Sequence, residues 1–132
     1  MSEVFAGDAV NAVGPITMVT IAETPAVTGN FVSPPYQNAK AMVSGVVNLT
    51  AGTAAGGITM RIRRNPNAEN VQISAAPTLS ATPGASYLIS LQAADTIPDG
   101  RSVQYQLTAT QLSATGNGTI AFASISVVLI SG

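Results

Sequence analysis

Hydrophobic and polar residues alternate with a period of two wherever the chain shows a pattern. In 102–110, Val103, Tyr105, Leu107 and Ala109 are separated by polar residues, and 58–63 and 87–92 follow the same rule. Such alternation is typical of a β-strand with one buried face. Weaker runs at 16–23, 41–50 and 71–73 predict further strands. Gly45, inside one of these runs, indicates a bulge or a close backbone approach.

The segment 119–130 departs from this pattern because it is apolar on both sides. Strict alternation turns Ile125, Val127 and Leu129 to one face. The opposite face then carries Ile120, Phe122, Val128 and Ile130. Two explanations stay open: a central strand of a closed sandwich, or a strand whose outer side is covered by another subunit.

Turn residues separate the strand-like runs, and helical spacing of apolar residues is nearly absent. Short strands at intervals of about ten residues are typical of sandwiches and jelly rolls. We therefore predict an all-β, antiparallel β-sandwich of the jelly-roll type with about eight or nine strands. The domain is expected to span 15–132, and 1–14 is expected to be an N-terminal arm or the first edge strand.

The composition argues against catalysis. The chain has no His and no Cys, which excludes Cys/His metal sites, cysteine nucleophiles, disulfides and Ser-His-Asp triads. A general base would have to be Asp, Glu, Tyr or the single lysine, Lys40, and none has a partner at a telling spacing. We expect no enzyme activity, no catalytic residue, no metal and no cofactor.

Asp95 and Asp99 flank one predicted turn and are the only closely spaced carboxylates with a conceivable chemical role. A glycosidase needs two positioned carboxyl groups, usually beside aromatic sugar platforms, and a calcium loop needs more oxygen ligands than two acids supply. Asp before a turn and Asp-Gly within it have ordinary backbone roles. Turn formation is the preferred interpretation for both residues.

Arg61, Arg63 and Arg64 form the only local concentration of charge. Alternation places Arg61 and Arg63 on the outward face of a strand. They could bind carboxylates or phosphates of a partner, or they could be solvated charges that discourage edge pairing. A total of five basic residues and a net charge of −1 argue against nucleic-acid binding.

Targeting signals and membrane segments are also missing from the pattern. Glu3 and Asp8 stand where a secretory signal would carry Lys or Arg. The longest strongly apolar run, 125–130, is far shorter than the roughly 20 residues of a membrane helix. We expect no membrane association and a cytoplasmic location at synthesis.

Only 8% of the residues are charged, against roughly 25% in an average soluble domain. Free monomers usually rely on surface charge for solubility, and covering the surface with neighbouring copies removes that need. The composition therefore favours a structural or assembly role.

The segments 58–64, 95–100, 103–108 and 123–130 together resemble short jelly rolls of the tumour-necrosis-factor/C1q type. They resemble in particular the standalone versions found as phage virion accessory and capsid decoration (cement) proteins. The resemblance covers roughly residues 40–132. It implies a homotrimer with the C-terminal strand and the tyrosine strand near the threefold axis. The implied interface residues are Tyr105, Ile120, Phe122, Ile125, Val127, Val128 and Ile130.

On this basis we expect a non-enzymatic, trimeric decoration protein on the surface of a phage capsid, with the major capsid protein as its partner. Arg61, Arg63 and Arg64 are the candidate partner-binding residues. A self-assembling major coat protein is one alternative, although genome-binding coats usually carry a basic N-terminal arm. A C1q/TNF-like binding or adhesion module is the other, although no signal peptide, collagen-like stalk or calcium-ligand cluster accompanies it.

Overall fold

The computed structural model describes residues 4–18, 22–32, 39–52, 56–97, 102–112 and 117–130. Within these residues the chain forms nine strands and no helix. The strands are β1 (Val4–Thr17), β2 (Glu23–Val32), β3 (Ala39–Thr50), β4 (Gly56–Arg64), β5 (Val71–Gln72), β6 (Thr78–Ala81), β7 (Ser86–Ile97), β8 (Ser102–Gln111) and β9 (Thr119–Ile130).

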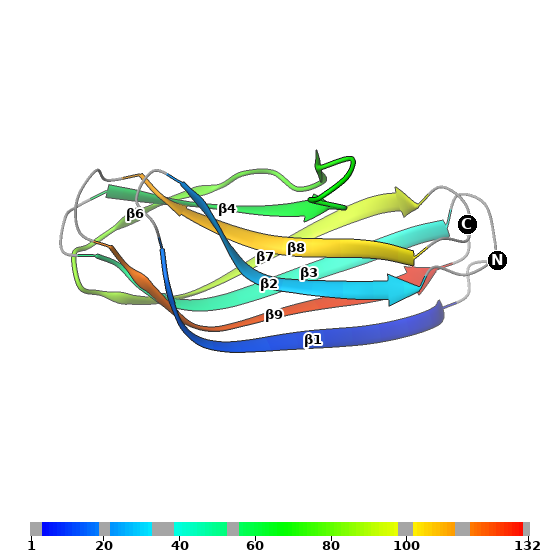
Figure 1. Cartoon of the computed structure of the whole chain (residues 1–132), viewed down its shortest axis with the longest axis horizontal. Coiled ribbons are helices and arrows are strands. Elements are labelled where there is room, and N and C mark those ends of the chain that lie inside the picture. The colour runs from blue at the N-terminus through cyan, green and yellow to red at the C-terminus, as the bar shows by residue number, and fades with distance from the viewer. Residues whose placement is uncertain are drawn as a thin grey trace.

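The strands pair in a nested order. β1 pairs with β9, β2 with β8, β3 with β7 and β4 with β6, all antiparallel, as in one long hairpin. The hairpin is rolled up so that β9 also pairs with β3 and β8 with β4. One sheet has the order β1-β9-β3-β7 and the other β2-β8-β4-β5, with β6 also along β4 (Figure 1). This arrangement is a jelly roll, and the predicted fold class is confirmed.

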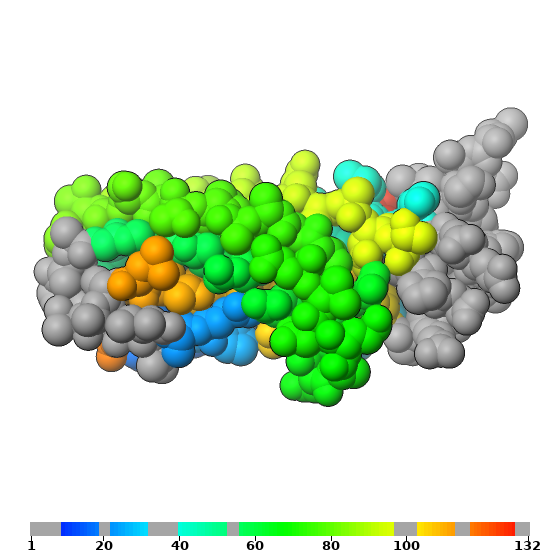
Figure 2. All heavy atoms as spheres, turned by 90° about the horizontal axis from the view of Figure 1, so that it is seen from above, coloured from blue at the N-terminus to red at the C-terminus, as the bar shows by residue number. Residues whose placement is uncertain are grey.

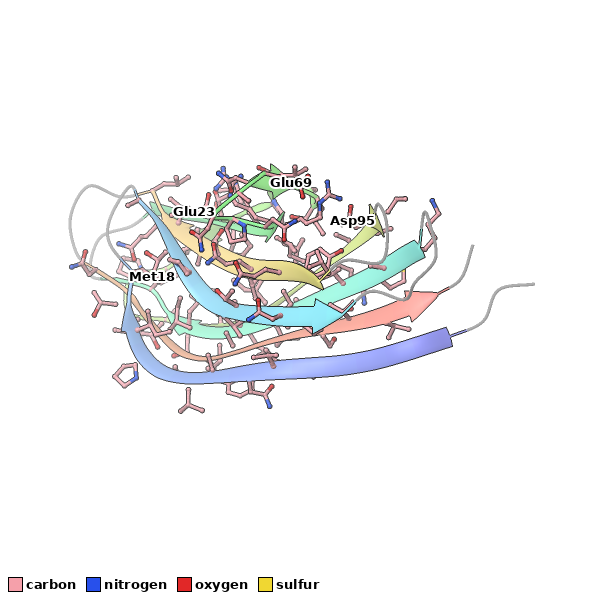
Figure 3. All side chains as sticks on the ribbon, turned by 45° about the vertical axis from the view of Figure 1, so that its right-hand side comes forward. Met18, Glu23, Glu69 and Asp95 are labelled. Carbon is pink, nitrogen blue, oxygen red and sulfur yellow. The ribbon has the colours of Figure 1, made fainter. Side chains whose placement is uncertain are left out.

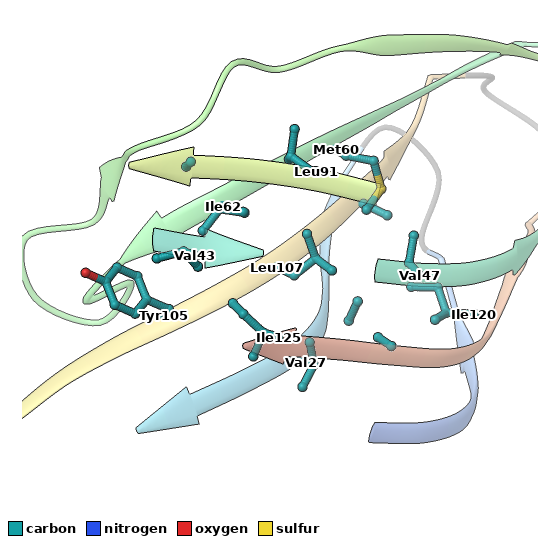
Figure 4. Packing of buried hydrophobic residues seen from close by; sticks show 14 of the residues in the cluster. Val27, Val43, Val47, Met60, Ile62, Leu91, Tyr105, Leu107, Ile120 and Ile125 are labelled. Carbon is teal, nitrogen blue, oxygen red and sulfur yellow. The ribbon is translucent and has the colours of Figure 1, made fainter. Parts of the chain in front are cut away.

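The core lies between the two sheets and follows the predicted alternation. Ile58, Met60 and Ile62 of β4 are at most 1% exposed, and Leu107 and Tyr105 of β8 are fully buried (Figure 4). Burying a side chain of this size contributes roughly 1.5–3 kcal/mol. These positions therefore fix the inner face of the second sheet.

Gly45 marks a close approach between the sheets, as predicted. A Cβ at this position would lie 2.9 Å from Leu107 Cδ1. The register of β3 shows no shift at Gly45 with either neighbouring strand, so this glycine does not mark a bulge. Its missing side chain gives Leu107 room to pack.

A bulge in β9 changes which residues face outward. Asn48 and Leu49 are consecutive in β3, yet they pair with Phe122 and Ile120, which are two residues apart. An extra residue in one strand reverses the side-chain alternation on one side of it. Ile120 is consequently fully buried, and its predicted position on the face of Phe122 is wrong.

β9 is nevertheless a central strand, because β1 and β3 flank it. It carries apolar residues on both of its sides. Ile125 and Val127 point into the core, at most 2% exposed, whereas Phe122 and Val128 point outward with 36% and 37% exposed. The central position explains the inner set. The outward-pointing Phe122 and Val128 remain partly exposed in a single chain.

β1 is an edge strand that runs from Val4 through Thr17 and crosses residue 15, where the domain was expected to start. Two strand boundaries differ from the sequence-based expectation. The strand predicted at 16–23 is wrong, because β1 ends at Thr17 and β2 starts at Glu23. Asp95 lies inside β7 and not in a turn. Asp99 lies outside the described residues.

Candidate functional site

The outer face of the β1-β9-β3-β7 sheet carries two rows of exposed apolar side chains. In one row Val13, Phe122 and Leu88 come from β1, β9 and β7, with Asn48 of β3 among them. Val13 is 81% exposed and Leu88 75% exposed. We call this outer surface the apolar face.

The second row of the apolar face combines Val128 of β9, Met42 of β3 and Ala94 of β7. Met42 is 43% exposed. Between the two apolar rows lie small or polar residues and one further valine in register, namely Asn11, Ser124, Val46 and Ser90, then Ala9, Ser126, Ser44 and Gln92. None of these side chains is charged.

Among the described side chains, the one charge on the apolar face is Lys40, at the end of β3. Lys40 Nζ donates a hydrogen bond of 2.8 Å to Thr96 Oγ1 of β7. The other described side chains of this face are uncharged. A contiguous surface of exposed apolar groups departs from an ordinary solvated surface.

The predicted oligomer-interface residues divide between this face and the core. Tyr105, Ile120, Ile125 and Val127 are buried inside one chain, so a neighbouring copy cannot reach them. Phe122 and Val128 lie on the apolar face, and Val13, Met42 and Leu88 join them there. The side chain of Ile130 lies outside the part of the chain that the structure describes.

The outer face of the β2-β8-β4 sheet is different, because its polar side chains bind one another across the strands. Gln104 Nε2 donates to Asn30 Oδ1 at 3.1 Å, and Gln106 Nε2 donates to Thr28 Oγ1 at 3.0 Å. The hydroxyls of Thr59 and Thr78 are 2.9 Å apart. We call this surface the polar face.

Two of the three predicted partner-binding arginines lie on the polar face and share one carboxylate. Arg63 donates from Nε and Nη2 to the two oxygens of Glu23, at 2.6 and 2.8 Å. Arg61 Nη1 is 3.8 Å from Glu23 Oε1 and donates a long hydrogen bond of 3.5 Å to Thr110 Oγ1. The hydrogen bond from Arg63 lowers the pKa of Glu23, although burial opposes the shift.

The third arginine, Arg64, points into a buried cluster at the end of β4. Its Nη1 donates to Asp95 Oδ1 at 2.7 Å, and the Tyr105 hydroxyl donates to Asp95 Oδ2 at 2.7 Å. The side chains of Arg64 and Asp95 are only 13% and 8% exposed. Burial, and then the bond to Asp95, raise the pKa of Tyr105. Arg64 is therefore tied to its own chain.

These carboxylates were not recognised as arginine partners from the sequence. Glu23 is 40 positions from Arg63 and Asp95 is 31 positions from Arg64. Pairing of β2 and β4 with β8 brings the first two together, and packing of one sheet on the other brings Asp95 of β7 to Arg64 of β4. Figure 3 shows Glu23, Glu69 and Asp95 on the side of the sandwich that carries β4, away from Met18. Glu69 Oε2 also lies 3.5 Å from Arg64 Nη2.

The described residues contain no group of three or more acidic side chains that could hold a metal ion. They also contain no helix that could cross a membrane.

No family model and no curated protein matches the chain. Solved structures match in fold at low identity. The T13 particle of infectious bursal disease virus has a TM-score of 0.56 at 8% identity, over 98% of this chain and 35% of the viral protein. The globular domain of zebrafish complement 1qA has a TM-score of 0.53 at 12% identity, over 92% of this chain and 94% of that domain. This chain thus spans about a third of the viral protein and most of the complement domain.

Proposed function

We propose that this chain is a non-enzymatic structural protein of a virion, a homotrimeric decoration protein that sits on a phage capsid. The observation that carries the proposal is the apolar face, where Val13, Met42, Leu88, Phe122 and Val128 are each more than a third exposed. A surface of this kind is typical of a protein–protein contact.

Self-association supplies the cover that the apolar face needs. Fully burying one such side chain contributes roughly 1.5–3 kcal/mol, so several together provide a substantial driving force. Closed cyclic symmetry covers the same surface on every copy and leaves no open end. Three copies arranged around β9 would bury Phe122 and Val128 near the axis.

The polar face then remains available for the capsid. Arg63 already has a bidentate carboxylate partner, whereas Arg61 is held only at 3.8 and 3.5 Å. A guanidinium whose carboxylate is already bound more closely by a second arginine is suited to an acidic side chain of another protein. Arg61 is accordingly the arginine that we assign to the capsid contact.

Two further observations support the proposal. The jelly roll of this chain is similar to the corresponding part of the infectious bursal disease virus particle protein. The carboxylates Glu23 and Asp95 are each bound by an arginine, which leaves neither of them free as a general base. The second observation favours a structural role over catalysis.

Light scattering on the purified chain tests the assembly. A homotrimer gives three times the chain mass of 13.3 kDa, and a mass of one chain at micromolar concentration contradicts it. Phe122→Asp should dissociate the trimer, since it places a carboxylate in an apolar contact. Electron cryo-microscopy of the source particles tests the decoration role, because the chain must then appear as trimeric density on a larger shell.

A further inference from the structure

The sheet edges of this molecule differ in how well they are protected. An edge strand presents unpaired N–H and C=O groups, which can pair with a strand of another chain. Natural proteins block such pairing with short strands, prolines, bulges or charges at the edge. An edge without any of these devices is a candidate interaction site.

Three of the four edges carry a blocking device. β1 contains Pro15, within a register shift between Val13 and Ile16. β2 contains Pro25, next to a register shift of its own. On the far side of β4 lie only the short strands β5 and β6, of two and four residues.

β7 is the exception. It pairs with β3 over its full length of twelve residues without a register shift, and it contains no proline. Its one charged residue, Asp95, is turned inward and bound to Arg64 with 8% of the side chain exposed. Lys40 reaches only Thr96, near the end of the strand. The stretch 86–94 is therefore long, regular and uncharged.

The free edge of β7 is also open to solvent. Tyr87 and Ile89 point inward but remain partly exposed, whereas their β3 partners Leu49 and Val47 are fully buried. In the space-filling view, β7 (yellow-green to yellow) reaches the upper margin of the molecule (Figure 2). A second strand could approach from that side.

We propose that β7 pairs antiparallel with β7 of a second copy, about a twofold axis. Among the edges that the structure describes, those of β1 and β2 carry a proline and a register shift, so β7 is the best complement that this chain offers to itself. Twofold pairing sets the uncharged stretch against itself and brings Asp95 of one copy toward the Ser86 end of the other. The two four-stranded sheets then become one continuous sheet.

This contact is independent of the proposed trimer. It uses the backbone groups at the free edge of β7, whereas the proposed trimer centres on Phe122 and Val128 of β9, with β3 between the two strands. Each contact can form without the other. If both form, two trimers are joined through their edges.

Single cysteines test the contact directly, because the chain has none of its own. Directly opposed residues in an antiparallel pair have Cα atoms about 4.5–5.5 Å apart, within the range of a disulfide. Ser86→Cys, Ser90→Cys, Gln92→Cys and Ala94→Cys, alone and in pairwise mixtures, should give at least one sample in which a linked dimer is the main product after mild oxidation. Ser80→Cys, on the short edge strand β6, is the matched control and should stay unlinked. No linked dimer in any β7 sample overturns the proposal.

The mass of the wild type separates this proposal from the trimer. Six copies support both contacts, and two copies support the β7 pair but contradict the trimer. Three copies overturn the β7 pair and leave the trimer standing, and one copy overturns both. Ser90→Lys should halve a mass of two copies, because like charges then meet across the pair, whereas Ser80→Lys should leave it unchanged.

Discussion

The two outer faces of this sandwich present different side chains to water. On the polar face, Gln104, Gln106 and Arg63 bind Asn30, Thr28 and Glu23 across neighbouring strands. On the apolar face, Phe122 and Val128 stand above a central strand with no comparable partners. Both sheets belong to the same fold, so the difference lies in which side chains each sheet turns outward.

The few charged side chains that the structure describes are concentrated on one side of the sandwich. The described carboxylates Glu23, Glu69 and Asp95 all lie within reach of arginines, so the few charges stabilise one side of the sandwich. The apolar face receives almost none of them. One face therefore has polar side chains that are bound within a single chain, and the other has apolar side chains that remain exposed in a single chain.

The largest expected effect comes from introducing a charge on the apolar face. Val128→Asp should break the threefold contact and reduce the mass of the assembly to one third, because a carboxylate would be buried in an apolar contact. Thr28→Asp places the same charge on the polar face and should leave the mass unchanged. Light scattering on both variants decides the matter. Equal masses for the two would remove the functional distinction between the faces.

A second change removes a carboxylate from the buried cluster behind the polar face. Asp95→Asn leaves the Arg64 guanidinium, 13% exposed, without its closest counter-charge. Removing one partner of a buried pair costs about 3 kcal/mol. Glu69→Gln, at a 46% exposed site on the same arginine, should cost less than about 0.5 kcal/mol. Urea unfolding curves should show this difference, and similar midpoints for both variants would contradict it.

A smaller effect is expected from the Arg63–Glu23 pair, and it depends on pH. The pKa of Glu23 is lowered from its ordinary value near 4.5, so the pair stabilises the fold above that pH and loses this contribution as the pH falls through the lowered value. Glu23→Gln should be less stable than the wild type by about 1 kcal/mol at neutral pH. Thermal unfolding should show the two converging in acid. A constant difference down to pH 3 would argue against the pair.

The smallest effect is expected from removing one of the cross-strand hydrogen bonds that glutamine side chains make on the polar face. Gln106→Ala removes one exposed hydrogen bond to Thr28, and water can replace the lost partner. The cost should stay within about 0.5 kcal/mol, measured by urea unfolding. A cost above about 1.5 kcal/mol would mean that the polar face is a cooperative network.

The sequence predicted the local features of this fold well. Alternation located β4 and β8 and their buried faces, and Gly45 correctly indicated a close approach to the opposite sheet. These features depend on residues that are near one another in the chain. Their physical cause is the two-residue period of a strand.

Features that depend on distant residues were missed or assigned wrongly. The bulge that turns Ile120 inward follows from how β9 matches β3, and no residue type in 119–122 signals it. Asp95 beside a Pro-Gly-rich segment favoured a turn, but pairing with β3 extends β7 beyond it. Glu23 meets Arg63 only after β2 and β4 have both joined β8.

The nested strand order also has a consequence for how the chain reaches this fold. Within the described residues β1 pairs with β9 alone, more than a hundred residues later in the chain, so β1 cannot pair until β9 has been synthesised. Pairings of such long sequence separation are entropically costly to close and slow to form. Strands with exposed edges persist meanwhile, which favours association between nascent chains. Efficient folding should therefore depend on synthesis reaching β9, the strand that joins β1 to β3.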